Sequence, residues 1–310
     1  MVDNTQTFPP ARALPTQAAA RQRARRRFWR GGLQGSDYAW AIAFVIPYIA
    51  VFLAFVVYPV LYGLWMGSEP SLYTDLFNDP VYLMTIVNTL IYLAVAVNVK
   101  MFGALMLSGF FMRKGWWVKG LLLIFVLPWA VPSMPAFISI HWFFNGDYGF
   151  LNNALYKFFG LNGPAWLDSR WLALGSMITS YIWKWMPFWT VIFLAGRMAI
   201  PQEVKEAAKI VGATGFRSFI HVDFPLLANL YLVCTLLSTI FTVGDFNTSY
   251  FVTGGGPAFS TFVLATLGVR DAFDLSQPRL GVAAVITALP LVIPLVIILM
   301  RKLKTSTVEL

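Results

Sequence analysis

Long apolar stretches alternate with short charged segments along most of the chain. The clearest stretch lies between Asp37 and Glu69, where 31 consecutive residues carry no charge. A helix that crosses a bilayer needs about 20 predominantly apolar residues. By this criterion the charge-poor stretches predict six membrane-spanning helices, at about 38–66, 86–111, 119–143, 171–196, 224–245 and 280–300. Buried helices of a soluble protein are a poor alternative for six stretches of this length.

The composition agrees with a membrane protein of little extramembrane mass. Of 310 residues, 58% are hydrophobic and 12% are charged, whereas soluble domains carry about 25% charged residues. The predicted fold class is therefore an all-α membrane protein with six transmembrane helices. These helices occupy a membrane domain at 36–304, between a disordered basic tail at 1–35 and a short C-terminal tail at 305–310.

Basic residues gather in alternate loops, which sets the orientation. The two tails and the loops after spans two and four hold 17 of the 23 basic residues, namely Arg12, Arg21, Arg23, Arg25, Arg26, Arg27, Arg30, Arg113, Lys114, Lys119, Arg197, Lys205, Lys209, Arg217, Arg301, Lys302 and Lys304. Lys and Arg in short loops favour the cytoplasmic side, so both termini are predicted to be cytoplasmic. The net charge of +9 thus indicates topology and a tail near anionic lipid. It does not indicate nucleic-acid binding.

The N-terminal segment Arg25-Arg26-Arg27-Phe28 loosely resembles a twin-arginine export signal. However, the apolar run that follows is much longer than the apolar region of a signal peptide, and no small-residue cleavage site follows it. An uncleaved first span is therefore the better interpretation.

Six residues inside the spans or at their ends are candidates for a substrate path: Asn98, Lys100, Trp183, Lys184, Asp245 and Asn247. An ionisable side chain at mid-span is costly unless it faces protein or a water-filled path. Lys100 therefore either contacts substrate or pairs with a neighbouring span. Lys184 poses the same choice, and its flanking indoles slightly favour packing. Asp245 and Asn247 either bind a polyhydroxylated ligand or cap a helix.

Catalytic and metal-binding patterns are missing from the sequence. Cys234 is the single cysteine, and neither His141 nor His221 has metal-ligand neighbours. There is no H-E-x-x-H, no nucleophile elbow and no pair of carboxylates within the spans. Asp271 and Asp274 lie together in the loop before the last span, where we expect them to be solvated or to contact a binding protein. We therefore expect neither catalysis nor a metal site.

The loop at 197–223 predicts a short helix along the membrane face. Pro201 suits the first turn of this helix, and Glu203 and Glu206 suit its positive N-terminal end. Gly212 can end it in the left-handed conformation. Because the helix also carries a patch of small residues, another surface can approach it closely.

This loop resembles the EAA loop of permease subunits of ATP-binding-cassette importers, on the residues Glu206-Ala207-Ala208 followed by Gly212. Three other segments are similar to the carbohydrate-uptake branch of that family, its MalF/UgpA-like members: Trp183 to Phe188, Asp245-Phe246-Asn247, and Thr253 to Pro257. The resemblance covers about residues 38–303.

The sequence departs from the family pattern at three places. Val211 stands where an acidic residue is common in the family. The family usually has a second proline after the one that matches Pro225, and Asn229 or its neighbours stand there in this chain. Either change alters the fine geometry of the loop while Glu206 and Gly212 remain. Lys100 matches no family motif.

The resemblance implies a permease subunit of a binding-protein-dependent importer in the bacterial inner membrane. Its substrate would be a sugar, oligosaccharide or polyol, including glycerol or a phosphorylated derivative. The coupling residues would be Glu203, Glu206, Ala207, Ala208 and Gly212, which dock on a cytoplasmic ATPase dimer. The other implied partners are a second homologous permease and an extracytoplasmic solute-binding protein. No G-x-x-x-x-G-K-[ST] phosphate loop occurs, so ATP and Mg²⁺ would be bound by the ATPase, and we expect no cofactor in this chain.

The main alternative is an ion-coupled secondary transporter of a small polar solute. Such proteins often show internal repeats and broken midplane helices, whereas no convincing repeat is found here and six spans are few. A membrane-embedded enzyme is a weaker alternative, because the catalytic motifs are missing.

Overall fold

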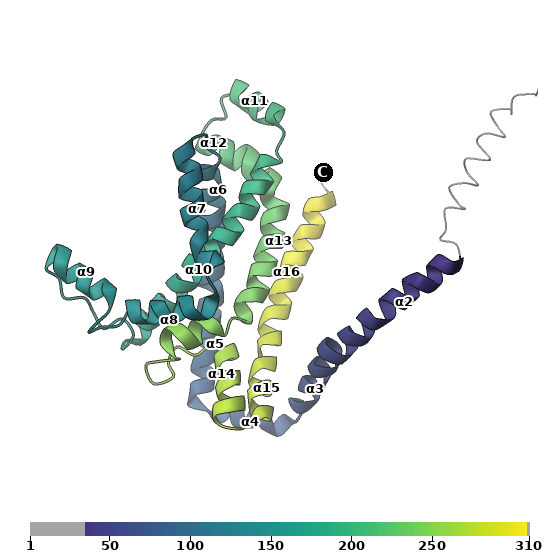
Figure 1. Ribbon diagram of the computed structural model, residues 1–310, viewed down its shortest axis with the longest axis vertical. Helices are drawn as coiled ribbons and strands as arrows, with labels where there is room; N and C mark the ends of the chain where they lie inside the picture. Colours follow the sequence, from purple (N-terminus) through teal and green to yellow (C-terminus); the bar gives the residue numbers. More distant parts are fainter. Residues whose placement is uncertain (1–34, 309–310) are drawn as a thin grey trace, which may run out of the picture. The chain divides into compact units, whose positions relative to one another are not determined.

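The computed structural model describes residues 35–308, and every regular element in this range is helical (Figure 1). The chain divides into two compact units, one ending at Tyr62 and the other beginning at Gly63. The predicted basic tail at 1–35 lies outside the described residues except for Gly35, where the first described helix begins.

The described part of the first unit is one apolar helical rod. It consists of α2 (Gly35–Phe52), a π-helical turn η1 (Leu53–Val57) and the beginning of α3 (Tyr58–Met66). Phe44 and Phe55 expose 74% and 77% of their surface. An apolar rod without a packing partner in its own unit is typical of a helix that faces lipid.

The second unit holds the other helices. Its α-helices are α4 (Pro70–Asn78), α5 (Pro80–Tyr92), α6 (Asn98–Phe111), α7 (Trp116–Ala130), α8 (Ser133–Phe143), α9 (Phe150–Phe159), α10 (Arg170–Met198), α11 (Gln202–Ile210), α12 (Phe216–Ser218), α13 (Phe224–Val243), α14 (Leu264–Val269), α15 (Pro278–Ile286) and α16 (Ala288–Val308). Its π-helical turns are η2 (Leu93–Val97), η3 (Phe219–Asp223), η4 (Ser249–Thr253) and η5 (Arg270–Asp274). One buried core lies where α6, α10 and α13 meet, around Met101, Phe193 and Cys234.

Four described helical stretches are long and apolar enough to cross a membrane: Trp40–Met66, Pro80–Phe111, Phe216–Val243 and Pro278–Leu303. Each overlaps one predicted span. The predicted span at 171–196 coincides with α10, whose 29 residues are long enough to cross. However, buried Ser, Thr and Lys side chains make α10 less apolar than the other four.

The predicted span at 119–143 is not one straight helix. The structure contains α7 and α8 in its place, bent by 98° relative to each other. The bend follows from Pro132, because a proline disfavours helical backbone in the residue before it. Val131 accordingly adopts an extended conformation, with φ −71° and ψ 139°. This pair is a fifth crossing only if both helices are counted as one broken span.

Three predicted boundaries also differ from the structure. The fifth apolar stretch begins at Phe216 instead of about 224. The second span begins at Pro80 instead of about 86, because the carboxylate of Asp79 accepts a hydrogen bond from the N–H of Val81 at 2.8 Å and caps the helix. At the other end of the chain, α16 continues to Val308. Most of the predicted tail at 305–310 is therefore helical, since no glycine or proline stops the helix where the apolar run ends.

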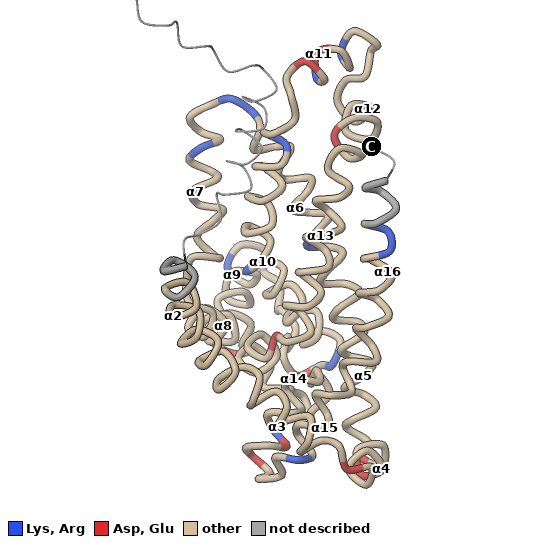
Figure 2. The backbone as a smooth tube through the Cα atoms, turned by 90° about the vertical axis from the view of Figure 1, so that its right-hand side faces the viewer, with Lys and Arg blue, Asp and Glu red and all other residues tan. Residues whose placement is uncertain are grey.

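Charged residues mark the two ends of the second unit. Basic residues lie in the loop between α6 and α7, around α11 and near the end of α16, all at the same end (Figure 2). Acidic residues of α4 lie at the opposite end (Figure 2). The polar ends of the bundle are thus unlike in charge.

The segment between η4 and α14 is fixed to two other helices. The side-chain amide of Asn88, on α5, donates hydrogen bonds to the carbonyls of Ser260 at 2.7 Å and Phe262 at 3.1 Å. Arg170, at the start of α10, donates to the Asn88 side-chain oxygen at 3.0 Å. Because Asn88 is buried, these contacts hold the segment 254–263, which we call the glycine-rich loop, in one position.

Candidate functional site

The short helix α11 has well-defined ends. Pro201 is its N-cap residue, one position before the predicted first turn. At the other end Gly212 adopts the left-handed conformation, with φ 77°, which confirms the prediction. The N–H groups of Gly212 and Ala213 donate to the carbonyls of Lys209 at 3.0 Å and Ala208 at 2.9 Å. This is the Schellman arrangement, which satisfies carbonyls that the helix end leaves free.

The two alanines of α11 lie on different faces. Ala208 is buried within this chain, whereas Ala207 is exposed together with Glu203 and Glu206. The Glu206 carboxylate accepts a hydrogen bond only from Gln202 of its own helix, at 3.2 Å, among the contacts of the described residues. It is therefore available to a basic group on another surface.

Large apolar side chains are exposed next to these acidic residues. Ile210, Val211 and Phe216 expose 87%, 81% and 72% of their surface. Exposed apolar patches rimmed by polar residues mark interaction sites. The helix and the turn after it thus present both acidic and apolar groups to a partner.

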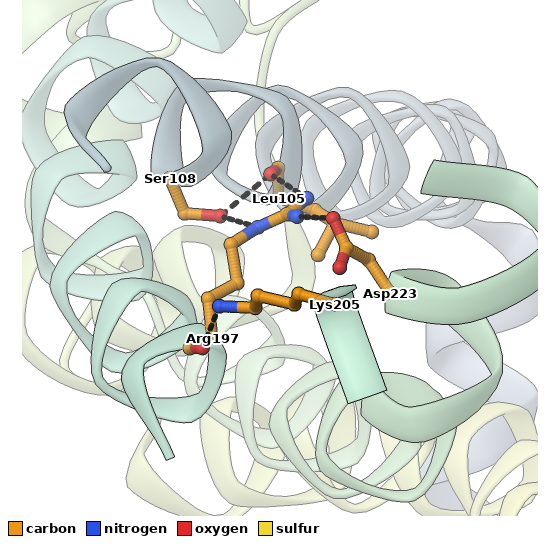
Figure 3. A network of polar contacts seen from close by, with 5 residues as sticks. All are labelled: Leu105, Ser108, Arg197, Lys205 and Asp223. Atoms are coloured by element: carbon orange, nitrogen blue, oxygen red, sulfur yellow. Dashed lines mark hydrogen bonds and ion pairs between the residues drawn. The ribbon is translucent and has the colours of Figure 1, made fainter. Parts of the chain in front are cut away.

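The loop that carries α11 is anchored by Arg197, a residue in the last turn of α10 (Figure 3). Its guanidinium donates to the hydroxyl of Ser108 at 2.8 Å, to the carbonyl of Leu105 at 3.2 Å and to the carboxylate of Asp223 at 2.5 Å. The carbonyl of Arg197 in turn accepts a hydrogen bond from Lys205 at 3.1 Å. One buried side chain therefore connects α6, α10 and η3, and its backbone holds α11.

This anchor was not predicted from the sequence. Arg197 was interpreted only as one of the basic residues that set the orientation. The available signal was the position of Arg197 and Asp223, two opposite charges at the two ends of the loop 197–223. A hollow of about 640 Å³ opens beside the anchor and is lined in part by Lys114, Lys205 and Lys209.

A second group of polar side chains is buried among the spans. The hydroxyl of Tyr92 donates to the Asp245 carboxylate at 2.8 Å, and the Tyr181 hydroxyl lies 2.9 Å from that of Thr242. The ammonium of Lys100 lies over the Tyr181 ring, 4.2 Å from its centroid. We call these five residues the polar cluster. All have 9% or less of their surface exposed.

The cluster brings together two of the six predicted path residues, Lys100 and Asp245. The Lys100 ammonium and the Asp245 carboxylate form no direct ion pair among those of the described residues. Tyr92, Tyr181 and Thr242 were not among the predicted path residues. A tyrosine hydroxyl in mid-span is itself a signal, since it needs a hydrogen-bond partner when buried.

The other four predicted path residues lie outside the polar cluster. Asn98 and Asn247 are exposed, and Asn98 donates to the carbonyl of Ala94 in its own helix at 2.7 Å. Trp183 exposes 45% of its surface. These three residues have no contact with the cluster among the hydrogen bonds and ring contacts of the described chain.

Lys184 caps the end of α7 and does not lie on an indole. Its ammonium donates to the carbonyls of Pro128 at 2.8 Å and Trp129 at 3.4 Å, and also to that of Val131. Pro132 explains this contact, because it has no N–H for the carbonyl of Pro128 four residues earlier. Lys184 therefore supplies the donors that the helix end lacks.

An exposed acidic and apolar helix at one polar end, together with buried ionisable side chains between apolar helices, is typical of a component of a membrane transport system. Residues 101–305 match the family model described as "Binding-protein-dependent transport system inner membrane component". The chain belongs to this family, and it is a multi-pass protein of the cytoplasmic membrane.

Relatives of the chain are permease subunits. It is 30% identical over 256 residues to the sulfoquinovosyl glycerol transport system permease protein SmoG of Agrobacterium fabrum, covering 76% of this chain and 81% of that protein. It is 31% identical over 241 residues to the lactose transport system permease protein LacF of Rhizobium radiobacter, covering 72% and 79%. Its fold matches a bacterial alginate ABC transporter solved with an alginate pentasaccharide-bound periplasmic protein, with a TM-score of 0.74, 20% identity, and coverage of 84% of this chain and 92% of that chain.

Proposed function

We propose that this chain is one of two homologous permease subunits of an ATP-driven importer that takes up a sugar, an oligosaccharide or a polyol. The observation that carries the proposal is α11, a capped helix with exposed acidic and apolar side chains. The loop that carries this helix is fixed to the spans by Arg197. The family supports binding-protein dependence, and relatives named for sulfoquinovosyl glycerol and lactose transport support the substrate class.

In this proposal α11 docks on a cytoplasmic ATPase dimer. Glu206 pairs with a basic residue of the ATPase, and Ala207 allows a close approach. ATP and Mg²⁺ are bound by the ATPase. Because Arg197 joins α10 to α6 and η3 at the base of the loop, movement of α11 is passed to the spans instead of being absorbed by the loop.

The proposed topology has six spans with both termini in the cytoplasm. The end that carries α11 and most basic residues then faces the cytoplasm, as the distribution of Lys and Arg requires. Counting α10 as a span, and α7 with α8 as one broken span, gives six. The end with the acidic residues of α4 faces the solute-binding protein.

The polar cluster is the proposed substrate contact at the middle of the spans. Buried ionisable residues at this depth mark pathways for substrates. Tyrosine and threonine hydroxyls with one carboxylate and one ammonium offer both donors and acceptors to hydroxyl groups. The ammonium also suits a phosphorylated ligand.

Gentle solubilisation of the tagged chain, followed by identification of what co-purifies, tests the proposal. A second permease and an ATPase with a phosphate loop, in stoichiometric amounts, would support it. A lone chain or homo-oligomer that retains uptake without an ATPase would overturn it and favour ion-coupled transport. The binding protein recovered with the complex is then screened against sugars and polyols.

A further inference from the structure

A second cavity shares no lining residue with the hollow beside Arg197. It has a volume of about 440 Å³ and is lined by residues of η4, the glycine-rich loop, α14 and η5, among them Tyr250, Phe259, Phe262, Thr266, Arg270 and Asp274. This volume lies within the range of small-molecule sites. None of the residues that line it belongs to the polar cluster.

Aromatic rings form one wall of this cavity. Phe259 and Phe262 are stacked, with centroids 5.4 Å apart and planes at 25°. The guanidinium of Arg270 lies 4.5 Å from the centroid of Phe259 and 5.8 Å from that of Phe262. Phe259 and Tyr250 still expose 46% and 41% of their surface, so their faces remain available to a ligand.

Two buried polar atoms of residues that line the cavity have no hydrogen-bond partner in the described chain. They are the hydroxyl of Thr266, a residue with 1% of its surface exposed, and one terminal nitrogen of Arg270. Asp271 lies 3.7 Å from Arg270, too far for a hydrogen bond. Because buried polar groups are almost always hydrogen-bonded, these two atoms next to the cavity leave hydrogen bonds that the described chain does not supply.

The charges of the cavity favour a neutral ligand. Arg270 is the one basic residue that lines it, and Asp274 stands in the same wall. Asp271, which does not line the cavity, further compensates the charge of the guanidinium at 3.7 Å. An anion would therefore meet no excess of positive charge.

The backbone holds Phe259 in this position at a cost. Ala258 and Phe259 both have left-handed backbones, with φ 47° and 62°. Such conformations are unfavourable for residues other than glycine and concentrate at functional sites. The contacts of Asn88 with Ser260 and Phe262 fix the following residues.

From these observations we propose that this cavity is a second carbohydrate subsite, which binds one neutral hydroxylated ring. The C–H face of the ring lies against Phe259 and Tyr250. Its hydroxyl groups bond to Thr266, Arg270 and Asp274. The identity of the ligand class rests on the proposed function, in which a sugar or polyol passes through this subunit, and the cavity deepens that function by adding an entry site apart from the polar cluster.

The test uses the assembled importer in lipid nanodiscs, without binding protein, and saturation-transfer difference NMR with methyl α-glucopyranoside as the probe. We expect Phe259→Leu and Thr266→Val each to reduce the signal at least fivefold. Thr266→Ser keeps the hydroxyl and should restore it to within twofold. Phe273→Leu is the matched control, because Phe273 is in the same segment, 77% exposed, and outside the cavity lining.

Glucuronate, an anion of similar shape, is the comparison probe and should bind more weakly than the glucoside. The proposal is overturned if the unmodified complex gives no glucoside signal, if both cavity variants keep it, or if glucuronate binds better. Complex yield and melting temperature are measured for every variant, and a cavity variant that fails to assemble is replaced by Thr266→Ala. Since the complex used already contains the ATPase, a negative result rejects the subsite and leaves the importer function intact.

Discussion

The guanidinium of Arg197 and the carboxylate of Asp223 form an ion pair 2.5 Å apart. These residues are the two ends of the loop that carries α11, so the pair closes the loop at its base. Arg197 also bonds to Ser108 and Leu105 of α6. Arg197 therefore fixes the base of the loop to α6, α10 and η3.

Replacing Arg197 by methionine should destabilise the subunit and uncouple it. Breaking a buried ion pair costs about 3–5 kcal/mol, and we expect the lower end of this range because Asp223 keeps 19% of its side chain exposed. The measurements are the melting temperature of the purified complex and the stimulation of its ATPase by loaded binding protein. Arg197→Lys, which keeps the charge but loses the fork of donors, should be intermediate. An unchanged melting temperature for Arg197→Met would contradict the anchor.

Glu206→Lys should weaken docking of the ATPase while the chain still inserts in the membrane. The variant reverses the charge of an exposed residue that bonds only within its own helix, so the fold has little reason to change. Co-purification of the ATPase and uptake of labelled substrate are the measurements. Asp75→Lys, on exposed α4 at the opposite end, is the control and should leave docking normal. Normal docking and uptake in Glu206→Lys would count against this role.

The two buried lysines should respond differently to replacement by methionine. Lys100→Met should lower uptake more than assembly, because Lys100 contacts the ring of Tyr181 and no backbone carbonyl in the described chain. Lys184→Met should lower assembly and uptake together, since three carbonyls at the end of α7 lose their donor. Complex yield is measured beside transport rate. If yield and uptake fall in parallel for Lys100→Met, that lysine is structural.

Asp271 should make the stability of the subunit depend on pH. Burial raises the pKa of this carboxyl from 3.8 to about 6 in the folded protein, although Arg270 opposes the change. The folded state therefore binds the proton more tightly than the unfolded state. The resulting stabilisation is complete below about pH 3.8 and is lost as the pH rises through about 6. Melting temperatures from pH 5 to 8 should fall less steeply in Asp271→Asn than in the unmodified protein, and equal slopes would contradict this assignment.

Short-range signals predicted α11 well, and long-range contacts could not be predicted. Pro201 and Gly212 act on the backbone next to them, so the ends of the helix could be predicted to within one residue. The contact between Tyr92 and Asp245 joins residues 153 positions apart. One sequence shows that each of these side chains needs a partner, but it does not show which partner the packing of η2 against α13 supplies.

The bend between α7 and α8 shows a different limit. Apolar content alone suggested one span at 119–143, although Pro128 and Pro132 were visible within it. A proline permits a kink without determining its size. At the bend of 98° the ammonium of Lys184 donates to the free carbonyls, and Lys184 belongs to another helix, α10.

The π-helical turn η2 determines which residue of α6 faces the polar cluster. A turn closed by i→i+5 hydrogen bonds contains one residue more than an α-helical turn, and each added residue rotates all that follows by about 100°. The π-helical turn Leu93–Val97 accommodates its surplus residue without this rotation, so that Lys100 lies inward while Val99 and Phe102 remain exposed. Deleting exposed Ala94 would convert the turn to ordinary helix with Lys100 still inward, whereas deleting Val99 would rotate Lys100 toward lipid. Where a relative lacks this surplus residue, the residue that corresponds to Lys100 is therefore found by aligning the two chains from α6 onward. Counting from the start of the span would identify the wrong residue.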